Sequence, residues 1–263
     1  WVRNNGDATG AEATTARYAG ERGMQTYGVV YKRWKSVSFY ANHAEALQPG
    51  SVAPKEAANK YEITGIAHSK QNEVGVKTDF GRVGGTLSLF EIKKPTAITN
   101  SDTNIYALDG EQRNRGIELN VFGEPVLGLR LNGSATWIDA ELTKTQNGLN
   151  KGNKPVGVSN FYAALGAEYD IKPVDGLTAT ARVNHTGSQY ANSANTKKLD
   201  SYTTLDLGVR YRMRLNQGQN EMVWRAGVDN VTNEKYWASV EDSGTYIYQG
   251  DPRTLRVSMS YDF

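Results

Sequence analysis

Residues 205–214 read LDLGVRYRMR, and in this stretch apolar residues alternate with charged or small ones. The odd positions are Leu205, Leu207, Val209, Tyr211 and Met213, and the even positions are Asp206, Gly208, Arg210, Arg212 and Arg214. A period of two places these sets on opposite faces of a β-strand, whereas a helix would scatter the arginines around every side. The stretch therefore predicts a strand with one apolar and one charged face.

The same alternation recurs along the chain. It is clear in residues 117–121, 127–137, 177–184, 222–229 and 255–263, and weaker in residues 27–31, 37–41, 74–80 and 87–89. We count about eleven complete strands plus a stub at residues 1–3. Phe90 and Ile92 take the opposite parity from Leu87 and Leu89, which predicts a bulge there or a strand leaving the membrane zone.

The connections between these strands are of two kinds, which alternate. Short ones, mostly rich in Gly, Pro, Asp and Asn, fall at residues 32–35, 80–82, 123–126, 172–176 and 216–220. Long ones fall at residues 45–69, 95–111, 144–154, 191–201 and 232–251. This order is typical of an up-and-down antiparallel meander with all long loops at one rim.

Composition excludes several classes of protein. The 263 residues carry 30 Lys+Arg against 28 Asp+Glu, a net charge of +2 that gives no strong field for nucleic acid. No run approaches the roughly 18 apolar residues of a spanning helix. The low mean hydropathy of -0.58 remains compatible with a spanning β-barrel, because each of its strands alternates.

Few residues are available for metal or thiol chemistry. Cysteine is absent, which excludes disulfides, thiolate catalysis and Cys-based zinc sites. His43, His68 and His185 are widely spaced, so we expect solvated surface histidines and no metal site. The pair Asp139 and Glu141 is expected to be solvated at a strand rim and to carry no acid–base catalysis.

The apolar face of such strands meets either a protein core or lipid. Strands of ten or more residues exceed the usual length in soluble sheets and favour lipid. So does the charged set that would line a wet interior: Arg182, Arg210, Arg212, Arg214, Arg225 and Arg256 with Glu118, Asp206 and Asp229. Aromatic residues near strand ends favour membrane-interface girdles: Tyr31, Trp34, Phe80, Phe122, Tyr261 and Phe263 by the short turns, Trp137 and Phe161 by the long loops. We predict an all-β, up-and-down antiparallel transmembrane β-barrel.

Four segments resemble TonB-dependent siderophore receptors of the outer membrane. The ending PRTLRVSMSYDF (residues 252–263) resembles their last strand, and VDNVTNEKYWAS (residues 228–239) resembles the segment before their last long loop. QRNRGIEL (residues 112–119) and SKQNEVGVK (residues 69–77) resemble two further strands. The sequence YWAS at residues 236–239 points toward the hydroxamate-type branch.

The resemblance implies a 22-stranded barrel with an N-terminal plug inside. Residues 1–263 would then be the C-terminal portion of the barrel, without plug or TonB box, and we interpret the chain, which opens at Trp1, as a fragment or a processed product. The short turns would be periplasmic and the long loops extracellular. The implied function is that of a receptor, not an enzyme: it binds a ferric siderophore and needs no other cofactor. Its other partners would be outer-membrane lipid and, through the missing part, the TonB–ExbB–ExbD complex.

Such a receptor needs a concave aromatic surface with a few polar donors. Aromatic rings supply rigid contact area and arginine pairs with anionic oxygens. Candidates in or beside the long loops are Tyr61, Tyr106, Tyr190, Tyr236, Trp237, Tyr246, Tyr248 and Arg253.

Three other functions stay open. The main alternative is a passive outer-membrane porin, or a small closed barrel of about 12 strands. An outer-membrane hydrolase would need a Ser/His or Asp/His pair at the rim, and a soluble β-sandwich would bury the apolar faces against each other.

Overall fold

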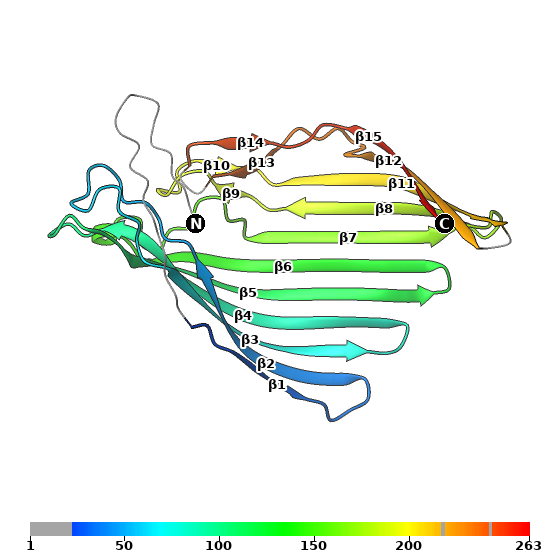
Figure 1. Cartoon of the computed structure of the whole chain (residues 1–263), viewed down its shortest axis with the longest axis horizontal. Helices are drawn as coiled ribbons and strands as arrows, with labels where there is room; N and C mark the ends of the chain where they lie inside the picture. Colours follow the sequence, from blue (N-terminus) through cyan, green and yellow to red (C-terminus); the bar gives the residue numbers. More distant parts are fainter. Residues whose placement is uncertain (1–22, 217–218, 242–243) are drawn as a thin grey trace.

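The computed structural model describes residues 23–216, 219–241 and 244–263. Eleven strands form one antiparallel sheet, in which each strand pairs with its neighbours in the order β1-β2-β3-β4-β5-β6-β7-β8-β11-β12-β15 (Figure 1). They are β1 (Thr26–Tyr31), β2 (Val37–Gln48), β3 (Ala67–Asp79), β4 (Val83–Thr99), β5 (Tyr106–Val126), β6 (Leu129–Lys144), β7 (Phe161–Asp170), β8 (Leu177–Thr186), β11 (Tyr202–Leu215), β12 (Asn220–Asp229) and β15 (Thr254–Asp262). The predicted meander of eleven strands is confirmed, while the expected stub at residues 1–3 lies outside the described residues.

Small elements occupy the long loops. They are the 3-10 turn η1 (Gln146–Gly148) and two short hairpins: β9 (Gln189–Tyr190) with β10 (Lys198–Leu199), and β13 (Trp237–Val240) with β14 (Ile247–Gln249). Among the described residues, no helix combines the length and the apolar content that a bilayer span requires.

The large sheet is a single layer. All substantial contacts between its strands join hydrogen-bonded neighbours. Its two faces differ sharply in exposure. Alternate apolar side chains such as Leu165, Val209 and Val257 are 52%, 47% and 65% exposed, whereas Ser88 and Thr178 on the other face are buried. Side chains crowd together on the concave side of a curved sheet, so the polar face is concave and the apolar face convex.

This arrangement rules out the soluble sandwich for the described residues, because no second layer covers the apolar face. It equally argues against a small closed barrel. The terminal strands β1 and β15 each pair with one neighbour only, so the described part of the sheet stays open. The structure is therefore part of the wall of a larger barrel.

Aromatic side chains lie on the convex face near both rims. By the long loops, the rings of Trp137 and Phe161 pack with their centroids 4.8 Å apart. By the short turns, Tyr211 is the cross-strand partner of Trp224. Phe122 was predicted to belong to the aromatic girdle at the membrane interface. This prediction is wrong, because its side chain lies on the polar face of β5, with Glu118 and Asn120.

The strand boundaries correct several predicted connections. β4 and β5 continue well past the predicted ends, so the loop predicted at residues 95–111 shrinks to residues 100–105. The turn predicted at residues 123–126 is a bulged part of β5, and the reversal occurs at residues 127–128, where Gly128 adopts a φ of +88°. The predicted turn at residues 80–82 is confirmed.

The predicted bulge near Phe90 is wrong. β4 keeps an unbroken register with both neighbours there, and its irregularity lies between Thr96 and Ile98. Phe90 points to the concave side and covers Gly116, where an added Cβ would lie 2.4 Å from the ring. Beyond Leu89 the convex positions become charged, beginning with Glu91, which agrees with the other expectation, a strand leaving the membrane zone.

We predict that Leu119→Arg, on the convex face, destabilises the full-length protein by about 2–4 kcal/mol, because it places a charge in hydrocarbon. Urea unfolding in lipid vesicles measures the loss. The matched control is Asn120→Arg, one residue along on the concave face, where a cation lies beside Glu118. Equal losses for both variants would contradict the assignment of the faces.

Candidate functional site at the long-loop rim

The long loops all leave the same end of the large sheet, at the left of Figure 1. They comprise residues 49–66, 100–105, 145–160, 187–201 and 230–253. All eight predicted ligand-binding residues lie in these loops or at the strand ends that they join. The loops form two groups, each held together by its own contacts.

The first loop lobe consists of residues 49–66 and 100–105. Asn59 holds it together: its side chain donates to the carbonyl of Tyr106 (3.0 Å) and accepts from the N–H of Tyr106 (2.9 Å). Asn104, in the left-handed region at φ +55°, donates from its side chain to the carbonyl of Glu56 (2.8 Å). These bonds bring the loop that carries Tyr61 onto the start of β5.

The second loop lobe consists of residues 153–157, 187–201, 230–241 and 244–253. Its small apolar centre is Ala191, Leu199 and Val240, with Val156 packed against it. Backbone bonding ties the loops together, since the N–H of Gly157 donates to the carbonyl of Tyr190 (3.0 Å). This lobe gathers the candidates that follow β8 and β12: Tyr190, Tyr236, Trp237, Tyr246, Tyr248 and Arg253.

Asn230, 4% exposed, fixes the base of the last long loop. Its side chain donates to the carbonyls of Glu234 (2.9 Å) and Asp251 (3.0 Å), so it joins the two ends of the loop. Its own N–H donates to Asp206 Oδ1 on β11 (2.8 Å). The residue stands within the segment that resembled the receptor family, and its structural role there was not predicted.

The candidate rings divide into exposed and framework residues. Tyr61, Trp237, Tyr246 and Tyr248 are more than half exposed. Tyr106, Tyr190 and Tyr236 are partly buried within the lobes. Thus the exposed rings are available to a ligand, whereas the partly buried ones position the loops. Tyr61 and Tyr106 belong to the first loop lobe, and the other six candidates belong to the second.

Tyr236 stacks on Tyr202, with ring centroids 4.0 Å apart and an interplanar angle of 25°. Burial raises the pKa of the Tyr236 phenol above its ordinary value, and the neighbouring Tyr202 and Asp251 act in the same direction. Tyr202 was missed among the candidates. Tyr202 stands at the start of β11, at an even position like the polar residues Asp206 and Arg210. This position is the only signal in the sequence that its ring faces the lumen.

Two of the three histidines, His43 and His68, are paired with a carboxylate, which corrects the expectation that they are solvated, while His185 Nδ1 lies 2.8 Å from Thr203 Oγ1. The Nε2 atoms of His43 and His68 lie 3.5 and 2.9 Å from the Glu45 carboxylate, and both side chains are largely buried. Within the described residues, no group of His, Asp and Glu is arranged to hold a metal ion.

Asp139 and Glu141, the carboxylates considered for acid–base catalysis, also have cationic partners. Lys154 contacts Asp139, and the Arg113 guanidinium donates to Glu141 at 2.6 Å. Both carboxylates are therefore ion-paired, which corrects the expectation that they are only solvated.

A one-layer sheet with an apolar convex face, a polar concave face and its long loops at one rim is the wall of an outer-membrane β-barrel. The family described as "TonB dependent receptor-like, beta-barrel" matches residues 1–231, and the chain belongs to this family. Its members are receptors and transporters of the bacterial outer membrane, not enzymes, and this chain shares that location.

Relatives and solved structures agree with this assignment. The chain is 59% identical to the ferrichrome receptor FcuA of Yersinia enterocolitica over 90% of this chain and 32% of that protein. It is 26% identical to the ferrioxamine B receptor of Salmonella typhimurium strain LT2, over 86% of this chain and 32% of that protein. The crystal structure of BauA, the ferric preacinetobactin receptor from Acinetobacter baumannii, superposes with a TM-score of 0.80 at 39% identity, covering 91% of this chain and 36% of that one. The chain thus spans about a third of the length of the relatives it matches.

We predict that the phenol of Tyr236 loses its proton above the ordinary tyrosine pKa. Because the folded loop favours the protonated ring, the stack contributes stability that is intact below a pH of about 10 and is lost as the pH rises through the raised value. Ultraviolet titration of tyrosinate in wild type and Tyr236→Phe measures it, with the exposed Tyr246→Phe as spectral control. A Tyr236 component that titrates at or below the ordinary value would contradict the prediction.

Proposed function

We propose that this chain is the C-terminal part of the barrel of an outer-membrane receptor that binds a ferric siderophore at its long-loop rim for TonB-driven uptake. The observation that carries the proposal is the 59% identity to a receptor named for ferrichrome. Ferrichrome and ferrioxamine B are both hydroxamate chelates, so a ferric hydroxamate is the proposed cargo.

The rim supports this cargo chemically. Four exposed rings, from Tyr61, Trp237, Tyr246 and Tyr248, offer rigid amphipathic area to a chelate whose outer surface is largely organic. Arg253, held at the start of β15 by a bond from its N–H to Asn233 Oδ1 (3.0 Å), supplies a cation for ligand oxygens. The iron would arrive already chelated, so the protein needs to provide neither metal ligands nor a cofactor.

Energy coupling is proposed to reside outside this chain. The relatives extend over about three times its length, and in such receptors the remaining part would include a plug and the contact with TonB, ExbB and ExbD. The convex face is proposed to contact outer-membrane lipid, because its apolar side chains have no protein partner among the described residues.

We expect cells that carry the full-length gene to grow under iron limitation on ferrichrome or ferrioxamine B. Trp237→Ala and Tyr248→Ala should each weaken ferric-hydroxamate binding by about tenfold, since a stacked aromatic contributes about 0.5–1.5 kcal/mol beyond its area. Fluorescence titration of the purified receptor measures affinity.

Tyr31→Ala, which removes an exposed ring by the short turns, is the matched control and should leave affinity unchanged. Growth on no ferric chelate above a deletion strain would overturn the transport function. Normal affinity in both rim variants would instead overturn the assignment of the contact residues.

A further inference from the structure

Charged side chains cross the convex face of the large sheet near its long-loop end. Direct cross-strand partners on β2 to β6 form one row there: Glu45, Lys70, Lys93, Arg113 and Glu141. Two rows nearer the short turns, the direct partners are mostly apolar: Ala41, Val74, Leu89, Ile117 and Trp137. Because cross-strand partners share a face, the charged row lies on the lipid-facing side, just beyond the apolar band.

Three cations are direct neighbours in this row. Lys70 on β3 is the partner of Lys93 on β4, and Lys93 is the partner of Arg113 on β5. We call these three residues the cationic row. Its flanking carboxylates, Glu45 and Glu141, stand at the two ends, on β2 and β6. Like charges placed opposite each other destabilise a sheet, so the middle of the row gains from an added anion.

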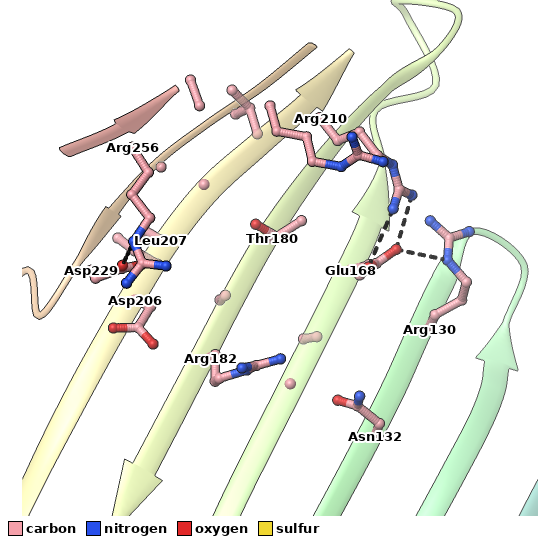
Figure 2. Close-up of a pocket in the computed structure, with 18 of the residues that line it drawn as sticks. Arg130, Asn132, Glu168, Thr180, Arg182, Asp206, Leu207, Arg210, Asp229 and Arg256 are labelled. Atoms are coloured by element: carbon pink, nitrogen blue, oxygen red, sulfur yellow. Dashed lines mark hydrogen bonds and ion pairs between the residues drawn. The ribbon is translucent and has the colours of Figure 1, made fainter. Parts of the chain in front are cut away.

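A different arrangement occurs on the concave face. Figure 2 shows Glu168 between Arg130 and Arg210, whose guanidinium groups lie 3.3 and 2.9 Å from its carboxylate. One carboxylate thus neutralises two arginines of separate strands. No carboxylate stands between the members of the cationic row, because they are direct partners on adjacent strands.

The two lysines of the cationic row are only loosely engaged. The Nζ atoms of Lys70 and Lys93 each lie 3.6 Å from a carboxylate, that of Glu45 and that of Glu91, and both lysine side chains are more than half exposed. Glu91 is bound more closely by Arg115, whose Nε lies 2.5 Å from it. The two ammonium groups are therefore free to turn toward another anion.

A shallow hollow of about 810 Å³ adjoins the cationic row on the side of the apolar band. Its floor is apolar and consists of Val74, Leu89, Ile117 and Trp137. Its edge toward the long loops is charged and consists of Glu91, Arg115, Asp139 and Lys154. An apolar floor below a charged edge fits an amphipathic molecule, with its chain on the floor and its polar head beyond the edge.

We propose that the cationic row binds the phosphate group of a membrane lipid whose acyl chain lies in the hollow. Phosphate offsets the repulsion among three adjacent cations, because lysine binds it as a point charge and arginine with paired N–H donors. The strands that form the site, β2 to β6, are all described and none is an edge of the sheet. The inference rests on the proposed lipid contact of the convex face, and not on the proposed cargo.

Native mass spectrometry of the full-length receptor in detergent tests the site, with diphosphorylated lipid A and phosphatidylcholine as separate probes. Lipid A presents phosphate monoesters, whereas choline neutralises the phosphate of the other lipid. We expect lipid A to bind more tightly. Lys93→Gln should weaken its binding about fivefold, the effect of one cation near an anionic membrane surface, and the double variant with Lys70→Gln about 25-fold.

The matched control is Lys94→Gln, which removes the same charge one residue along β4, on the concave face. Its affinity for lipid A should equal that of wild type. Wild type without preference for lipid A would overturn the proposal, as would equal weakening by Lys93→Gln and Lys94→Gln or unchanged binding in the double variant.

Inorganic phosphate added in excess tests whether the acyl chain takes part. Retention of bound lipid A supports the role of the hollow, and complete displacement by phosphate alone would overturn the assignment of the site to a lipid. Uptake of a ferric chelate is not measured, so a failure of the proposed cargo leaves this result unaffected.

Discussion

One constraint organises the described part of the chain: its strands satisfy each other's backbone groups in a single layer, and none of its segments covers the apolar side. In a bilayer core, unpaired N–H and C=O groups are costly, so an extended chain can cross only as a fully paired sheet. Exposed apolar side chains such as Val209 and Leu165 are then stable where lipid surrounds them. The same side chains would drive aggregation in water.

The single layer is curved, and its curvature separates an apolar face from a polar one. The convex face presents apolar and aromatic side chains, whereas the concave face crowds polar ones into ion pairs and hydrogen bonds. Arg130, Glu168 and Arg210 show how the lumen side stays satisfied: one carboxylate serves two guanidinium groups.

The rim combines rigid frames with exposed rings. Asparagine side chains hold the loops together, because one amide can both donate a hydrogen bond to a backbone carbonyl and accept one from a backbone N–H. Asn59 binds the first loop lobe to the start of β5, and Asn230 joins the two ends of the last long loop. Trp237 and Tyr248 can therefore remain exposed while the loop that carries them stays ordered. A receptor needs separate residues for these two tasks, since an aromatic ring that packs inside a loop is not available to contact a ligand.

The sequence by itself determined the strands, their number and their two faces, because the period-two pattern of residues 205–214 is a local property. Turn chemistry likewise located the reversal at residues 80–82. Only the tertiary structure decided where β4 and β5 end, that Tyr236 stacks on Tyr202, that His43 and His68 share Glu45, and that Arg210 faces Arg225. Each of these depends on the register or docking between segments separated along the chain. Hydrogen bonds spread over whole strands set that register, and alternation within a single strand does not encode it.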